Sequence, residues 1–109
     1  MIPTIHWDDF TKVDMRVGTI LRAEPNPKAK KPSLVLEIDF GALGIKRSSA
    51  QITQYDPKSL VGTQVIAVVN FPAKQIAGVE SQVLVLGAMA QEVILLRPDQ
   101  KVENGMQIG

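Results

Sequence analysis

The sequence predicts an all-β fold, a small closed barrel of short strands with one helical stretch near its middle. Apolar residues alternate with a period of two over 34–40, and continuous apolar runs of strand length occupy 65–69, 83–86 and 93–96. The candidate strands recur at intervals of roughly ten residues, which is typical of a barrel that leaves no open sheet edge. The 109 residues have the length of one domain, so we expect a single domain over 1–109.

The first half of the chain predicts three strands. Alternation over 15–20 indicates a half-buried strand that ends at the turn Pro25-Asn26-Pro27. The stretch 34–40 then places Leu34, Leu36, Ile38 and Phe40 on one face, which is the strongest strand signal in the sequence. A turn over 41–44 follows, and 45–49 is expected to return as its hairpin partner.

The second half predicts buried strands and a C-terminal hairpin. The runs 65–69, 83–86 and 93–96 lack alternation, so we expect both faces of each strand to be covered. The pair Asn104-Gly105 is a strong two-residue turn signal, and it predicts a hairpin that joins Val102 to Met106 and Ile108.

Helix is expected in two short stretches. Thr4 is a candidate cap for a turn through His6 to Lys12, which sets Trp7 and Phe10 three residues apart on one side. A second short helix is predicted within 50–60, interrupted by Asp56-Pro57.

The net charge hides an uneven distribution. The chain has 12 Lys plus Arg and 11 Asp plus Glu, which leaves +1 and argues against a uniformly basic nucleic-acid binder. The span 16–74, however, carries +5, whereas the two ends together carry −4. One local basic face therefore remains compatible with the composition.

The sequence offers little for catalysis. It has no cysteine and one histidine, which excludes disulfides, thiolate metal sites, cysteine nucleophiles and multi-histidine metal sites. It also lacks the P-loop, GxSxG and HExxH motifs. Asp8-Asp9 is either a favourable acidic pair at a helix start or a metal ligand, and His6 is either a surface residue or a ligand. We expect no enzyme activity, no metal and no cofactor.

The sequence also predicts a soluble protein that stays in the cytoplasm. The N-terminal ten residues lack the basic and apolar regions of a signal peptide, and no apolar run approaches the roughly 20 residues that span a bilayer. We therefore expect a cytoplasmic protein without membrane insertion.

Two groups of polar residues are candidates for binding. Lys28-Ala29-Lys30-Lys31 lies between Pro27 and Pro32, which favour an extended loop that follows a phosphate backbone, and Lys46-Arg47 lies on the next hairpin. A solvated surface explains these charges equally well. Asn70, Ser48, Ser49 and Ser81 lie at strand ends, where they either face a ligand across the barrel mouth or cap turns.

Two motifs in the sequence resemble the tRNA-binding domain family. Asp14-Met15-Arg16-Val17-Gly18-Thr19-Ile20 is similar to its opening strand, and the stretch 69–81 is similar to its later signature of an Asn, a basic residue and Gly-x-x-Ser. Within the family, three stretches (45–53, 68–72 and 81–87) resemble bacterial protein-secretion chaperones. The resemblance runs from about residue 9 to the C-terminus.

This resemblance implies an OB-fold: a five-stranded Greek-key barrel with a short helix between the third and fourth strands. It also implies a homodimer built from segments added at both ends of the barrel. The interface candidates are Trp7, Phe10, Met106 and Ile108, which in a monomer would instead plug the base of the barrel.

The resemblance further implies binding residues near one mouth of the barrel, with Asn70, Lys74 and Ser81 as its centre. Arg16 is either a ligand contact or the ion-pair partner of a carboxylate, and Phe71 and Tyr55 are the plausible stacking rings. The full expected set for peptide or tRNA is Arg16, Ser48, Ser49, Asn70, Phe71, Lys74, Ser81 and Gln82.

Two departures from the family pattern suggest two ligands. Ser81-Gln82-Val83-Leu84 replaces the usual Ser-x-Gly-Met and makes the mouth more apolar, which favours an unfolded peptide. Asn26-Pro27-Lys28-Ala29-Lys30 replaces the usual His-Pro-x-Ala-Asp and exchanges an acid for a base, which favours anions.

The implied function is that of a non-enzymatic homodimeric chaperone that binds unfolded preproteins for export, with the export machinery as a further candidate partner. The alternative is a free-standing tRNA-binding protein that uses the same barrel face. Its electrostatic contacts would then be Lys28, Lys30, Lys31, Lys46 and Arg47.

Overall fold

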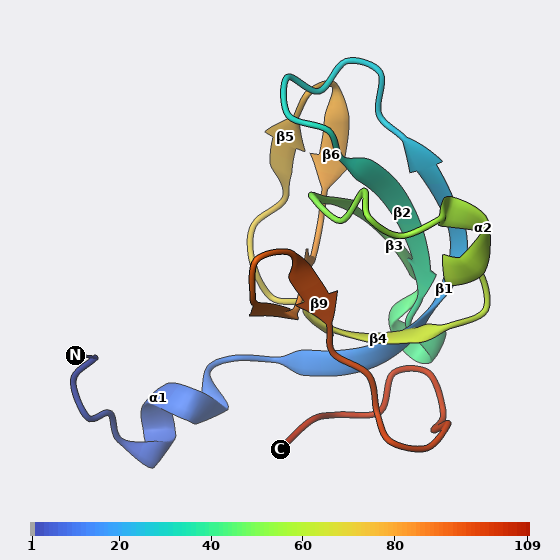
Figure 1. The fold of residues 1–109 in the computed structure, drawn as a ribbon. Helices are drawn as coiled ribbons and strands as arrows, with labels where there is room; N and C mark the ends of the chain where they lie inside the picture. Colours follow the sequence, from blue (N-terminus) through green and yellow to red (C-terminus); the bar gives the residue numbers. More distant parts are fainter. Residues whose placement is uncertain (1) are drawn as a thin grey trace.

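A computed structural model describes residues 2–109. Five strands form one antiparallel sheet in the order β3-β2-β1-β4-β7, and the sheet curls into a nearly closed barrel (Figure 1). Their bounds are β1 Met15–Pro25, β2 Leu34–Asp39, β3 Ile45–Ala50, β4 Gln64–Val68 and β7 Leu84–Val85. This strand order, with a helix between β3 and β4, confirms the predicted OB-fold.

Strand β2 supplies much of the core, as its alternation predicts. Leu34, Leu36, Ile38 and Phe40 are buried, whereas the intervening residues are only half-buried. Gly18 on β1 lies against Ile38 and Phe40, and a Cβ at this position would be 2.5 Å from Ile38 Cγ2. The absence of a side chain at Gly18 therefore lets β1 pack tightly against the β2 core face.

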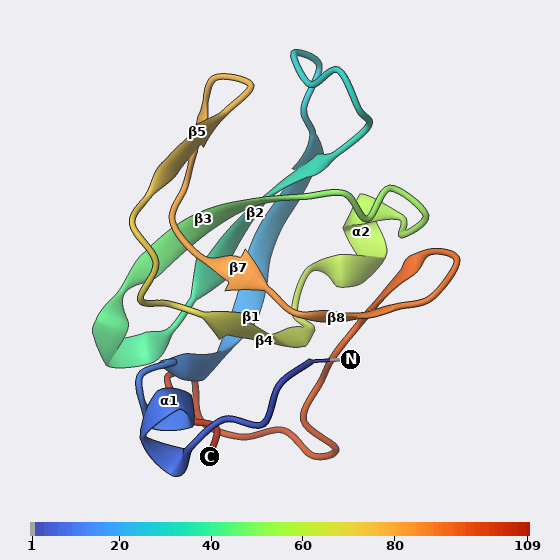
Figure 2. The same cartoon turned by 90° about the vertical axis from the view of Figure 1, so that its left-hand side faces the viewer.

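Two further hairpins extend from the barrel. They pair β5 Lys74–Ile76 with β6 Val79–Ser81, and β8 Gly87–Met89 with β9 Val93–Leu95. The β5–β6 hairpin and the loop between β1 and β2 lie at one end of the barrel, and both chain termini lie towards the other (Figures 1 and 2).

Coverage on both faces is confirmed for β4, which is almost entirely buried. The same prediction was wrong for the last two apolar runs. Leu84, Ile94 and Leu96 are exposed, because their strands lie at the edge of the barrel or in a hairpin outside it.

The helices are shorter than predicted. Helix α1 Trp7–Thr11 follows His6 as its N-cap rather than Thr4, and the His6 backbone N–H donates to the Asp9 carboxylate at 3.0 Å. Helix α2 Pro57–Leu60 begins at the Asp56-Pro57 pair that was expected to interrupt it. Asp56 accepts the Lys58 N–H as an N-cap, and proline is well suited to the first helical position.

A single turn of 3-10 helix, η1 Gly41–Leu43, joins β2 to β3 where the hairpin turn was predicted. No helix within residues 2–109 has the length and apolar character needed to cross a membrane.

The C-terminal segment forms the expected turn at Asn104-Gly105 but not the expected hairpin. The residues after the turn pair with β1 instead: Val17 N–H donates to Met106 O at 3.0 Å, and Ile108 N–H donates to Met15 O at 2.9 Å. The start of β1 runs beyond β2 and leaves backbone groups free for this pairing. The terminal segment thereby extends the sheet at the base of the barrel.

Candidate functional site

A groove of about 500 Å³ lies between the β5–β6 hairpin, the edge of β3 and the start of β7. It brings together five of the residues predicted to bind a ligand: Ser49, Phe71, Lys74, Ser81 and Gln82. The other predicted binding residues, Arg16, Ser48 and Asn70, do not line it.

Much of the groove wall is apolar. Phe71 and Leu84 are 54% and 51% exposed, and Pro72, Ile76 and Val83 also line the groove. Exposed side chains of this size in a concave surface are typical of a site that binds an apolar partner. Leu84 belongs to the stretch Ser81-Gln82-Val83-Leu84, whose departure from the family pattern predicted a more apolar mouth, whereas its apolar run predicted a strand covered on both faces.

The polar residues of the groove have structural bonds that close the barrel. Ser49 N–H donates to Ser81 Oγ at 3.0 Å, and Arg47 N–H donates to Gln82 Oε1 at 2.9 Å. Gln82 N–H returns a bond to Arg47 O at 2.8 Å. The seam between β3 and the β6–β7 segment is therefore held partly by side chains in place of a regular strand ladder.

Ser48 also contributes to this seam, with its side chain on the inner side of the barrel wall. It is 2% exposed, and its hydroxyl donates to Val83 O at 3.1 Å. The structure therefore places Ser48 in the barrel wall, where its side chain faces away from solvent.

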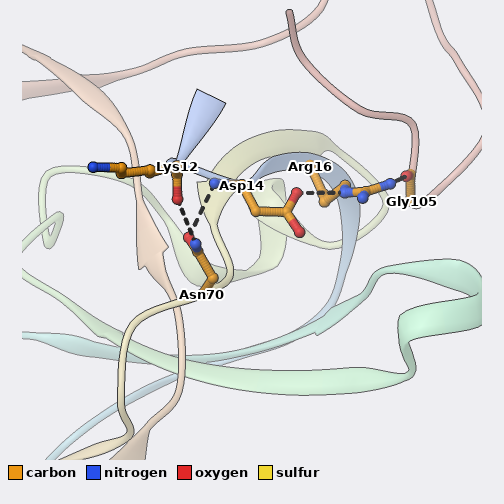
Figure 3. A network of polar contacts seen from close by, with 5 residues as sticks. All are labelled: Lys12, Asp14, Arg16, Asn70 and Gly105. Atoms are coloured by element: carbon orange, nitrogen blue, oxygen red, sulfur yellow. Dashed lines mark hydrogen bonds and ion pairs between the residues drawn. The ribbon is translucent and has the colours of Figure 1, made fainter. Parts of the chain in front are cut away.

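Asn70 connects the end of β4 to the segment between α1 and β1 (Figure 3). Its Oδ1 accepts the Asp14 N–H at 3.0 Å, and its Nδ2 donates to Lys12 O at 2.7 Å. Both ends of the amide are thus engaged by backbone groups. In this structure Asn70 fixes the chain that leads directly into Phe71 at the groove.

Arg16 has the ion pair that was one of its two predicted roles. Its Nε lies 2.6 Å from Asp14 Oδ1, and its Nη1 donates to Gly105 O at 3.1 Å (Figure 3). The hydrogen bond to Gly105 O links β1 to the C-terminal turn.

The stacking rings differ in their surroundings. The Tyr55 ring packs against the core, and its hydroxyl accepts the Leu95 N–H at 3.0 Å. Phe71 instead is exposed at the groove, where a ligand has access to it.

The predicted electrostatic residues separate into two groups. Lys28, Lys30 and Lys31 are all exposed in the loop between β1 and β2. On β3, Lys46 pairs with Ile38 and Arg47 with Glu37, so their side chains point to opposite faces of the sheet. The structure therefore keeps the loop lysines together but does not join Lys46 to Arg47.

The loop 26–33 is attached to the β5–β6 turn. Asn26 Nδ2 donates to Ala77 O at 3.4 Å, and a Cβ at Gly78 would lie 3.5 Å from Lys28 Cδ. Ala77 and Gly78 both have positive φ, as a tight two-residue hairpin turn requires. The basic loop and the hairpin that borders the groove are thus neighbours.

A second groove of about 340 Å³ beside this contact contains charges of both signs. Arg22 lies 2.6 Å from Glu24 and 3.9 Å from Glu37. The hydrogen bond to Glu24, together with the charges of both carboxylates, raises the pKa of Arg22. Because these carboxylates neutralise the arginine, this groove is a poor site for an anion despite Lys28 and Arg47 at its edge.

The predicted interface residues lie towards the base of the barrel. Trp7 and Phe10 contact one another with ring centroids 5.4 Å apart, and Trp7 remains 71% exposed. Met106 is exposed and Ile108 is half-buried on the segment that pairs with β1. Across residues 2–109, no group of three or more His, Asp or Glu side chains is arranged to hold a metal ion.

Comparison with known proteins places this geometry in a family. Residues 15–107 match the family model described as "Putative tRNA binding domain". The methionine–tRNA ligase of Methanosarcina mazei is 36% identical over 110 residues, and that of Porphyromonas gingivalis is 38% identical over 106 residues. These matches cover 98% and 95% of this chain, which spans about 15% of the length of each ligase.

Solved structures share this fold. The chaperone CsaA from Bacillus anthracis has a TM-score of 0.93 and 48% identity, covering 98% of this chain and all of that one. CsaA from Picrophilus torridus has the same TM-score and identity, covering 97% of this chain and all of that one. A barrel of this topology, matched to the family model over nearly its whole length, shows that the chain belongs to the tRNA-binding domain family.

Proposed function

We propose that this protein is a non-enzymatic chaperone that binds extended segments of unfolded preproteins in the groove beside the β5–β6 hairpin. The observation that carries the proposal is the exposure of Phe71 and Leu84 in the groove of about 500 Å³. An unfolded chain presents apolar side chains together with free backbone groups. The groove offers apolar contacts for the former, and Lys74 supplies a charged group at its border. The similarity to CsaA chaperones over the whole chain supports this proposal.

We further propose that the protein is a homodimer that acts in the cytoplasm. Trp7, Phe10, Met106 and Ile108 are the interface residues that we propose, because they place apolar surface at one end of the barrel. Two copies related by a two-fold axis would present two grooves to one extended client. The export machinery is the further partner that would receive the client.

Binding of a fluorescently labelled unfolded preprotein tests the peptide groove. Leu84→Ala removes apolar surface inside the groove, and we expect it to weaken binding several-fold. Leu21→Ala is a matched control, because Leu21 is 44% exposed and lies outside this groove. Equal loss of binding in both variants, or in neither, would refute the assignment of the groove.

A second candidate function is tRNA binding through the loop lysines. The observation that favours it is the group Lys28, Lys30 and Lys31, exposed on a loop attached to the β5–β6 hairpin. Lysines at this position lie close to the groove, so one strand of RNA could contact both the lysines and the groove. The family match supports this candidate.

Salt dependence distinguishes the two functions. We expect tRNA affinity to fall steeply between about 50 and 200 mM salt, because phosphate contacts release counterions, and peptide affinity to change little. Replacing Lys28, Lys30 and Lys31 together by alanine should abolish tRNA retention in a gel shift and spare preprotein binding. An equal loss of both ligands would indicate one shared electrostatic site instead.

A further inference from the structure

A smaller groove of about 340 Å³ lies between the basic loop and the turn of the β5–β6 hairpin. Lys30, Lys31 and Ser33 line it from the loop, Ile76 and Ala77 from the hairpin, and Gln51 from the end of β3. The loop contacts the hairpin turn through the bond from Asn26 Nδ2 to Ala77 O. The β1–β2 loop and the hairpin lie at the same end of the barrel (Figure 2).

Ser33 is the unusual residue of this groove. It is 5% exposed, and within residues 2–109 its hydroxyl is a buried side-chain group without a hydrogen-bond partner. The Ser33 backbone, in contrast, is paired, since its carbonyl accepts the Asn26 N–H at 3.0 Å. A buried hydroxyl without a partner costs free energy and is rare in proteins, so an acceptor that reached it would gain a hydrogen bond at little cost.

We propose that this groove is a phosphate subsite for the RNA backbone, in which Lys30 and Lys31 supply the charge and the Ser33 hydroxyl, turned towards the groove about its Cα–Cβ bond, donates to a phosphate oxygen. The inference rests on the second candidate function, tRNA binding. A charged acceptor would give the hydroxyl the bond that it lacks in the protein alone, and such bonds are stronger than neutral ones. Gln51 adds a side-chain amide with two further donors.

The charges favour this groove over its neighbours. Its lining, within the described part of the chain, contains two lysines and no acidic residue. The groove around Arg22 includes Glu24 and Glu37, and another groove beside Lys31 includes Glu92. An anion therefore meets carboxylates in those two grooves but not in this one.

The position of the subsite suits an extended strand. Ser49 and Ile76 line both this groove and the larger apolar one, so the two are adjacent. A phosphate held at Ser33 would place the neighbouring nucleotide towards the exposed ring of Phe71, where a base has a stacking surface.

The test compares tRNA affinity and thermal stability for the full-length protein and for Ser33→Ala. We expect about tenfold weaker tRNA binding, because a charge-assisted hydrogen bond is lost. The melting temperature should stay the same or rise, because the variant removes a hydroxyl that has no partner. Ser33→Thr retains the hydroxyl and should bind more tightly than Ser33→Ala.

The lysines give an independent readout. The slope of log affinity against log salt should fall by about 0.7 to 0.9 for Lys30→Ala, whereas Ser33→Ala should leave it unchanged. Lys101→Ala is the matched control, since this exposed lysine belongs to the C-terminal segment and should leave the slope unchanged.

Unchanged tRNA affinity in Ser33→Ala would overturn the subsite while leaving tRNA binding in place. A melting temperature several degrees lower would also overturn it, because the hydroxyl would then have a structural partner. No tRNA binding by the unaltered protein would instead refute the candidate function itself, and the subsite with it.

Discussion

Replacing Asn70 by alanine removes two hydrogen bonds that join the end of β4 to the segment before β1. These are the bonds from Asp14 N–H to Oδ1 at 3.0 Å and from Nδ2 to Lys12 O at 2.7 Å. Because the bonds are exposed to water, each contributes towards the lower end of the usual range, about 0.5–1 kcal/mol. We therefore expect Asn70→Ala to lower the free energy of unfolding by about 1–2 kcal/mol.

Asn70→Asp affects the two bonds differently. An aspartate still accepts from Asp14 N–H, but its second oxygen would face the Lys12 carbonyl oxygen and repel it, so we expect a loss at least as large as that of alanine. Urea unfolding at one fixed protein concentration measures both variants, because dimerisation would make stability depend on concentration. The denaturation midpoint should fall while the slope of unfolding free energy against urea stays constant.

The ligand assays decide between a structural role and a contact role for Asn70. If its amide acts by fixing the chain before Phe71, tRNA and preprotein affinity should fall by a similar, modest factor in Asn70→Ala. Unchanged stability with complete loss of tRNA binding would refute this reasoning and make Asn70 a direct ligand contact.

Three other substitutions test different parts of the molecule. Gly18→Ala should destabilise the protein by about 1–3 kcal/mol, because the new Cβ would lie 2.5 Å from Ile38 Cγ2. Thermal unfolding measures this, and a gain in stability would show that the core accommodates the methyl group. Ser48→Ala should lower the free energy of unfolding by about 1–2 kcal/mol, because the Val83 carbonyl loses its hydrogen-bond donor. Hydrogen exchange of the amides along the seam should become faster, and unchanged exchange would contradict this. Trp7→Ala should shift the protein towards monomer in analytical ultracentrifugation. Monomer stability should not fall, because Trp7 is 71% exposed. An unchanged sedimentation profile would show that Trp7 is not part of the interface.

Much of the barrel was predictable because periodicity reports burial directly. The alternation over 34–40 identified β2 and its inward face correctly, since one side of that strand faces the core and the other does not. The apolar run at 93–96 failed as a prediction of burial, because hydrophobicity alone does not show that a hairpin lies outside the barrel.

The candidate site was less predictable than the fold. The resemblance to a known family pointed to Lys74 and Ser81, which line the larger groove, and to a more apolar mouth at Ser81-Gln82-Val83-Leu84, but not to Ser33. The importance of Ser33 depends on a missing hydrogen-bond partner, and only a three-dimensional structure reveals this. Asn70 illustrates the reverse case: its position at a strand end suggested a ligand contact, but the structure shows both ends of its amide bonded to backbone.

The side-chain seam along β3 has a consequence for self-association. The outer edge of a strand normally presents N–H groups that attract any extended chain, including the strands of other copies. Here the Arg47 and Ser49 N–H groups are already bonded to Gln82 and Ser81. For the proposed chaperone function, a free edge of this kind would offer bound clients a template for aggregation. By occupying this edge, two polar side chains would restrict clients to side-chain contacts and so keep their binding reversible.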